Sequence, residues 1–210
     1  MRKVALETVD GITRIVLNNQ PIFQIGPLDQ GLWPEGIHAA PTNEALKYDL
    51  EMTRRFGWNM VRKHIKVEPD RWYYWADKLG VLVWQDMPSA DADNLIPAPA
   101  DDFEPELRAM IAGRYNHPSI VLRIVINEGW GQAQFGPLAI GRCVNLVKSL
   151  DPSRLVGDQC LGLDRLWRRR YLRPSHLCRP EFAASRGQSC RRAGRVWRPG
   201  LAYTGSPVGH

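Results

Sequence analysis

The sequence predicts an α/β fold in which parallel strands alternate with helices, as in a (β/α)8 barrel or a doubly wound sheet. Two observations support this prediction. Residues 120–126 (IVLRIVI) form an apolar run that is typical of a strand covered on both faces. Upstream of this run, the order strand, helix, strand repeats three times. The first two helices of the repeat are bounded by residues that favour helix ends.

The first unit of the repeat runs from a short apolar strand at residues 21–26 (PIFQIG) through a long loop to a helix. Thr42 is a suitable N-cap for this helix, and Phe56 and Gly57 mark its end. Residues 58–64 (WNMVRKH) then form the second strand.

The second unit contains a helix that begins at Glu68 and Pro69, because proline at the first helical position loses no hydrogen bond. Gly80 ends this helix, and residues 81–84 form the third strand. A third helix, at about residues 103–114, leads into the apolar run described above.

The apolar run ends abruptly in Asn127, Glu128, Gly129 and Trp130. In a (β/α)8 barrel, this end of a strand carries the catalytic groups. A carboxylic acid held between an amide and an indole, and partly shielded from water, can have its pKa raised enough to donate a proton near neutral pH. Glu128 is therefore the first candidate for catalysis. In isolation, Asn-Glu-Gly would suit a solvated turn, so this interpretation depends on the preceding repeat.

Several motifs in one register resemble the catalytic barrel of glycoside hydrolase family two, which contains β-galactosidases and β-glucuronidases. They are LDQGLWPEG, WNMVRKHIKVEPDRWYYWADKLGVLVWQDMPS, NHPSIV, NEGWGQ and LDPSR. The resemblance implies that residues 20–158 form the first half of a TIM barrel, about strands 1 to 4 or 5. It also implies that residues 1–19 are a remnant of the junction with an upstream β-sandwich domain.

The resemblance assigns the general acid/base role to Glu128 and a sugar-hydroxyl contact to Asn127. It further implies that four residues line the sugar pocket: Arg62, His64, Asp86 and Trp130, the last with an aromatic face for a pyranose ring. Without the resemblance, the first two would equally suit a solvated basic pair, and the carboxylate at position 86 could cap a helix or loop.

The implied reaction is hydrolysis of a β-glycoside with retention, which needs two carboxyl groups roughly 5 to 5.5 Å apart. No Glu of this chain matches the second carboxylate, the nucleophile, which in the family lies on the seventh strand. We therefore expect a fragment that is inactive alone. Two alternatives are a noncatalytic carbohydrate-binding or interaction fragment and, with less support, a nucleic-acid binder that uses its basic tail.

That tail, residues 159–210, contains 11 Arg, no Lys, three of the four Cys and only two acidic residues. Its charge of +9 leaves −3 for residues 1–158, because the whole chain carries +6. Arginine without lysine is typical of G+C-rich DNA translated out of frame. A one-base shift permits a string containing GEFGG, which resembles the family's nucleophile strand. We therefore expect residues 159–210 to be an out-of-frame, disordered tail.

Arg123 departs from the family pattern, because it occupies a mid-strand position that usually carries a large apolar or aromatic residue. A buried charge without a partner would be costly there. Strand alternation directs it away from the side of Glu128. Relaxed selection, a sequencing error or a partner elsewhere in the chain would each account for it.

The sequence predicts no metal site and no cofactor, because its histidines and cysteines lack the spacing of metal ligands. It shows neither a signal peptide nor a transmembrane segment, so cytoplasm is the default localisation. The expected partner is a β-glycoside, with no nucleic acid and no membrane. Half a barrel leaves open sheet edges, through which self-association is possible.

Overall fold

The computed structural model describes residues 2–88, 100–127 and 132–157, which form two β-sheets and four helices. The smaller sheet is antiparallel and contains β1 (Val4–Val9), β2 (Ile12–Leu17) and β3 (Gln20–Pro21). Asp10 and Gly11 turn the chain between the first two strands, and both have positive φ angles, 52° and 75°. Glycine and aspartate tolerate such angles better than most residues.

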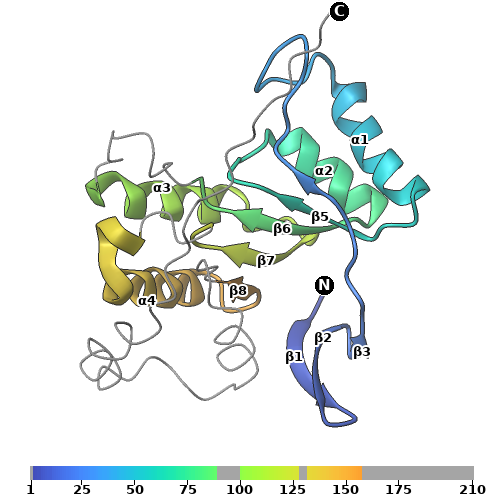
Figure 1. Ribbon diagram of the computed structural model, residues 1–210. Helices are drawn as coiled ribbons and strands as arrows, with labels where there is room; N and C mark the ends of the chain where they lie inside the picture. The colour runs from blue at the N-terminus through green and yellow to red at the C-terminus, as the bar shows by residue number, and fades with distance from the viewer. Residues whose placement is uncertain (1, 89–99, 128–131, 158–210) are drawn as a thin grey trace, which may run out of the picture. The chain divides into compact units, whose positions relative to one another are not determined.

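The larger sheet has five parallel strands in chain order, β4-β5-β6-β7-β8 (Figure 1). The strands are β4 (Leu28–Asp29), β5 (Met60–Lys63), β6 (Leu82–Asp86), β7 (Ile120–Ile124) and β8 (Leu155–Gly157). The small sheet packs against it through one apolar cluster, formed by Val4, Leu17, Ile22, Met60, Leu82, Trp84 and Val121.

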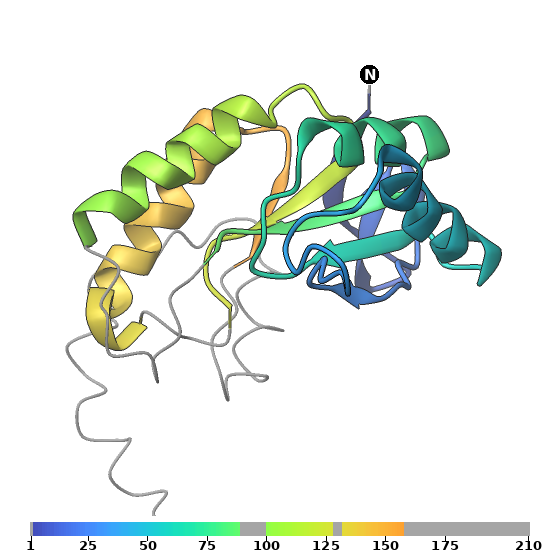
Figure 2. The ribbon, with the colours of Figure 1, turned by 90° about the horizontal axis from the view of Figure 1, so that it is seen from above.

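Four helices connect the parallel strands: α1 (Asn43–Arg55), α2 (Asp70–Leu79), α3 (Ala100–Gly113) and α4 (Gln132–Leu150). The first two lie side by side, and so do the last two (Figures 1 and 2). This alternation confirms the predicted α/β class with a parallel sheet.

The ends of the first two helices follow local chemistry. The Thr42 Oγ1 accepts a hydrogen bond from the Ala45 N–H at 3.0 Å, as the predicted N-cap requires. Gly80 ends α2 in the left-handed conformation, with φ of 68°. Pro69 is the N-cap of α2 rather than its first helical residue, so this helix begins one residue later than predicted.

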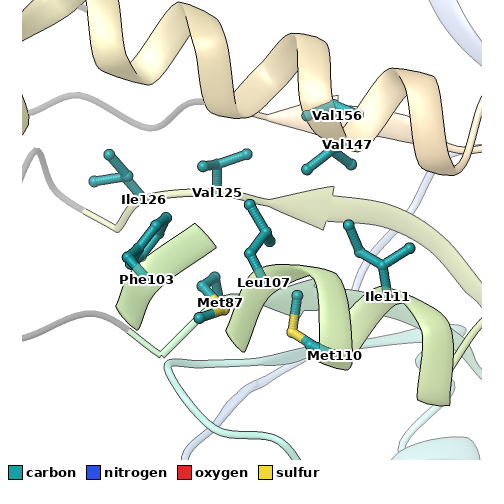
Figure 3. Packing of buried hydrophobic residues seen from close by; sticks show 9 residues of the cluster. All are labelled: Met87, Phe103, Leu107, Met110, Ile111, Val125, Ile126, Val147 and Val156. Atoms are coloured by element: carbon teal, nitrogen blue, oxygen red, sulfur yellow. The ribbon is translucent and has the colours of Figure 1, made fainter. Parts of the chain in front are cut away.

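All four helices cover the same face of the parallel sheet. Val61, Val83 and Ile120 are neighbours in the strand register, and they pack with α1 and α2. A second core lies under α3 and α4 (Figure 3), formed by Met87, Phe103, Leu107, Met110, Ile111, Val125, Ile126, Val147 and Val156. Residues of opposite parity, such as Arg62, point to the other face.

The predicted strand at residues 21–26 was wrong. Pro21 belongs to the antiparallel sheet, and the Ile22 N–H continues that pairing by donating to the Ile15 carbonyl at 3.0 Å. The parallel ladder starts only at Leu28, after Pro27, which has no N–H to donate. A short apolar run of this kind does not reveal which of two sheets it joins.

The described residues do not form a closed barrel. Their parallel sheet is open, with β4 and β8 as its edge strands. The expected half barrel is therefore supported only as an open parallel α/β sheet. The expected disordered tail at residues 159–210 lies outside the described residues.

Candidate functional site

Three polar side chains converge at the carboxyl ends of β5, β6 and β7. Arg62 lies in β5, Asp86 is the last residue of β6, and Asn127 follows β7 by three residues. Carboxyl ends of adjacent parallel strands meet at one edge of the sheet, where ligand sites of α/β proteins are found. The structure therefore brings together three of the six residues that the sequence analysis selected.

The Arg62 guanidinium holds this group together. Its Nε and Nη2 donate to the two carboxylate oxygens of Asp86, at 3.0 and 2.9 Å. The same Nη2 donates to the Asn127 Oδ1 at 2.8 Å. This contact fixes the Asn127 amide, so that its NH2 end is the one able to donate to a ligand.

Asp86 is completely buried, whereas the Arg62 side chain is 15% exposed. Burial raises the pKa of Asp86, and the hydrogen bonds and charge of Arg62, with the N–H of Ile65 at 3.3 Å, only partly offset it. The carboxylate is thus held in place by donors that do not fully compensate for its loss of water.

His64 lies beside this group, at the end of β5. Its Nδ1 is 3.0 Å from the Gln30 Nε2, and its backbone N–H donates to the Asp29 carbonyl at 2.9 Å. Gln30 was not among the residues predicted for the site. The available signal was its place in the LDQG motif, at the end of the strand next to β5.

A buried network of charges lies behind His64, on the helix-covered face. Lys63 contacts the carboxylates of Asp29 and Glu68, and Lys66 also contacts Glu68, at 3.0 Å. This network was not predicted either. The signal for it was a lysine that strand alternation turns toward the core.

Two selected residues, Glu128 and Trp130, lie outside the described residues. The structure places Asn127, the residue immediately before Glu128, but it describes neither the carboxylate nor the indole. The general acid/base assignment and the aromatic platform therefore remain predictions.

Arg123, the departure from the family pattern, has a partner within the chain. It is 1% exposed, and its Nε donates to the Asp151 Oδ2 at 3.1 Å. Arg154 contacts the same oxygen at 2.7 Å and donates to the Ile120 carbonyl at 2.9 Å. Burial disfavours the Asp151 carboxylate, but the charge of Arg154 and the Arg123 hydrogen bond outweigh it and lower the pKa of Asp151. Of the three accounts of Arg123, the structure supports a partner elsewhere in the chain.

No protein-family model matches the sequence. A curated protein from Formosa agariphila named as a putative β-glucuronidase is 31% identical over 94 residues, which span 44% of this chain and 11% of that protein. A solved structure titled Bacteroides uniformis β-glucuronidase is 26% identical, with a TM-score of 0.62 over 74% of this chain and 20% of that one. The chain resembles part of a family-two glycoside hydrolase.

Other family-two structures agree with this resemblance. A β-galacturonidase from Eisenbergiella tayi, solved with bound galacturonate, is 25% identical, with a TM-score of 0.62 over 74% of this chain and 28% of that one. A Ruminococcus gnavus β-glucuronidase has a TM-score of 0.65 over 75% of this chain, and at 20% identity it shows likeness of fold alone. Our chain spans about a tenth to a quarter of the length of these family-two relatives.

The described residues contain neither a metal-binding cluster nor a membrane-spanning helix. No three His, Cys, Asp or Glu side chains in this part of the chain are grouped so that they could hold a metal ion. Within the same residues, no helix combines the length and the apolar character needed to cross a membrane.

Proposed function

We propose that this chain forms the first part of a TIM barrel and serves in retaining β-glycoside hydrolysis. Parallel strands in chain order, connected by helices on one face, are the building pattern of that barrel. The family-two structures match most of this chain at the level of fold. Residues 20–158 are the proposed barrel part, and residues 1–19 a junction with a domain upstream.

The observation that carries this proposal is the group formed by Arg62, Asp86 and Asn127 at the carboxyl ends of three adjacent strands. Asn127 directly precedes Glu128. We assign Glu128 the role of proton donor to the leaving oxygen. The amide of Asn127 then donates to a hydroxyl of the sugar at the bond to be cleaved, and Arg62 fixes that amide.

Asp86 and His64 complete the proposed sugar pocket, with Trp130 as a stacking surface. The Asp86 carboxylate is completely buried and both its oxygens accept from Arg62, so in this pocket it holds the Arg62 guanidinium in place rather than contacting a sugar hydroxyl itself. The names of the relatives point to a uronic acid as the sugar. We therefore propose a β-linked uronide as the glycoside to test first.

Residues 1–210 contain no Glu that matches the nucleophile, so the double displacement cannot be completed by this chain alone. We expect it to bind a β-glycoside without turnover. The noncatalytic carbohydrate-binding alternative predicts the same binding. The catalytic proposal and the noncatalytic alternative predict different activities for a restored chain. In that chain, one base is inserted or deleted near codons 156–159, so that the shifted reading frame is translated.

Such a restored chain would hydrolyse 4-nitrophenyl β-D-glucuronide if the catalytic proposal holds, and a Glu128→Gln variant would lose that activity by roughly 10²- to 10⁴-fold. A restored chain that binds the glycoside with no turnover would instead support the noncatalytic alternative. Sequencing the coding DNA across codons 155–160 tests the frameshift directly. An unaltered frame, with stops in the shifted one, would refute it.

Binding by the present chain is tested by NMR titration with methyl β-D-glucuronide. The Asn127 side-chain amide is expected to shift with added glycoside, and Asn127→Ala should weaken binding by roughly tenfold, the value of one hydrogen bond to a ligand. Asn59→Ala is the matched control, because Asn59 makes its hydrogen bonds at the opposite end of β5, to Phe23 and Ile25. Equal losses in both variants would argue against this site.

We also propose that the open edge at β4 supports self-association. An apolar groove with a cavity volume of about 460 Å³ runs between β4 and α1, and it includes Leu28, Leu32 and Phe56, all more than half exposed. Exposed edges and apolar patches favour association. Sedimentation velocity with Phe56→Glu tests this. Identical association of the variant and the parent chain would contradict a role for the groove.

A further inference from the structure

Lys63 is a buried charged residue in one of the strands that carry the candidate site. Its side chain is 1% exposed, on the helix-covered face of β5, and its Nζ lies 2.9 Å from the Glu68 Oε1. The ammonium also contacts Asp29 and lies 4.4 Å from the ring centroid of Trp72. An apolar side chain in such a position is often as stable as a buried ion pair or more so. Stability alone therefore does not explain a lysine here.

The Lys63 network fixes the backbone on both sides of Gln30. One oxygen of the Asp29 carboxylate contacts Lys63, and the other accepts from the Gly31 N–H at 2.7 Å. The Gly31 carbonyl in turn accepts from the Lys66 Nζ at 2.6 Å. Gln30 is thus held between two residues that are both tied to the same ion network.

Gly31 shows how closely this loop approaches the network. Its φ of 62° favours glycine, and a Cβ built on it would lie 2.1 Å from the Glu68 Oε1 and 2.6 Å from the Lys66 Nζ. The backbone of the loop after β4 therefore packs directly against the Lys66–Glu68 ion pair in the loop after β5. There is no room for a side chain at position 31.

His64 directly follows Lys63, and its ring meets Gln30 at 3.0 Å. Ile65, the next residue, donates its N–H to the buried Asp86. The end of β5 thus connects the Lys63 network, on the helix-covered face of the sheet, to Asp86 on the other face. A shift of the Asp29 turn would move Gln30 away from His64.

We propose that Lys63 is a positioning residue: its ammonium clamps Asp29 to Glu68 and so holds the Gln30–His64 pair at the edge of the candidate sugar site. This inference rests on the proposed function for the identity of the ligand. The pair would contact a sugar hydroxyl through the Gln30 amide, oriented by the His64 ring. The carboxylate of Asp86 lies beside it.

The test uses two variants of the full chain. Lys63→Met removes the clamp. The double variant Lys63→Met/Glu68→Met also removes the carboxylate that would otherwise stay buried without Lys63. The urea concentration at its unfolding midpoint should therefore return most of the way to the parent value, while Asp29 still lacks its contact with Lys63. Lys47→Met is the control, because Lys47 also pairs with a carboxylate, Glu51 at 2.9 Å, and lies over a tryptophan ring, but on the helix surface.

The readouts are the ¹⁵N resonances of the His64 imidazole and the affinity for methyl β-D-glucuronide. We expect both Lys63 variants to shift the His64 Nδ1 signal and to weaken binding by roughly tenfold, about the value of one hydrogen bond to the ligand. The control should change neither. A double variant with the parent His64 signal and the parent affinity would overturn the proposal.

The two proposals can fail separately. If the parent chain does not respond to the glycoside, the proposed function fails, and the His64 signal alone decides whether Lys63 holds the pair. If the parent chain binds and the double variant keeps the His64 signal, only the clamp fails.

Discussion

Two arginine–carboxylate clusters in this molecule differ in how fully the carboxylate is compensated. Asp86, at the carboxyl ends of the strands, meets one arginine, Arg62, which is 15% exposed. Asp151, the residue directly after α4, meets two arginines, Arg123 and Arg154, which are 1% and 3% exposed. Both carboxylates are buried, but burial raises the pKa of the first, whereas the two arginines lower the pKa of the second.

This difference indicates different roles. The Asp151 cluster uses its hydrogen bonds within the fold, since Arg154 also donates to the carbonyls of Tyr115, His117 and Ile120. The Asp86 cluster gives its carboxylate one arginine rather than two, at a place where ligands bind in parallel α/β sheets. We therefore interpret the Asp151 cluster as a structural cluster and the Asp86 cluster as a recognition cluster.

Asp151→Asn should have the largest effect on stability. It leaves two buried guanidinium groups without their counter-charge, and removing one partner of a buried ion pair costs about 3–5 kcal/mol. Urea unfolding at neutral pH measures this loss. Glu51→Gln breaks the surface pair with Lys47 and is the control, with an expected cost of about 0.5 kcal/mol or less. Similar losses in the two variants would contradict a structural role for Asp151.

Arg62→Met should have an intermediate effect. It removes both donors of the fork on Asp86 and the donor to Asn127, which should cost about 1–3 kcal/mol in urea unfolding and raise the pKa of Asp86 further. Glycoside binding should fall with it. Unchanged binding, measured by NMR titration, would count against the recognition cluster.

Asp86→Asn should change stability by about 1 kcal/mol or less, because its raised pKa shows that the charged carboxylate is already disfavoured in the folded state. The expected loss is in glycoside affinity. A loss of unfolding free energy as large as that of Asp151→Asn would remove the contrast between the two clusters.

The smallest expected effect is a change with pH in the unfolding free energy that Asp151→Asn loses. The folded pKa of Asp151 is below the usual value of 3.8, so its contribution is present above pH 3.8 and disappears as pH falls through the folded pKa. The difference in unfolding free energy between this variant and the parent chain should therefore decrease as pH falls below 3.8. A constant gap would show that charge is not the cause.

Much of the fold could be predicted because its signals are local. The N-cap at Thr42 and the left-handed end at Gly80 depend on nearby residues, and both helices were predicted within a residue or so. The convergence of Arg62, Asp86 and Asn127 follows from their places at parallel strand ends. Their roles toward a sugar stay predictions, as do those of the residues outside the described ranges.

The rest depends on contacts between distant parts of the chain. Arg123 pairs with Asp151, which is 28 residues away in the sequence, and Lys63 pairs with Asp29, which is 34 residues away. No local pattern encodes such pairs. The segment at residues 21–26 was misread for the same reason, because its apolar pattern suits either sheet and pairing with Ile15 decides the outcome.

The most direct test of the contrast is a single ¹³C NMR titration that follows the carboxyl carbons of Asp86 and Asp151 in the same sample. We expect Asp86 to titrate above 3.8 and Asp151 below it. As pH rises through its folded pKa, Asp86 then loses the stability it contributed in acid, whereas the Asp151 contribution is full above pH 3.8 and is lost as pH falls through its own folded pKa. Asp86 titrating at or below Asp151 would contradict the division into a recognition cluster and a structural cluster.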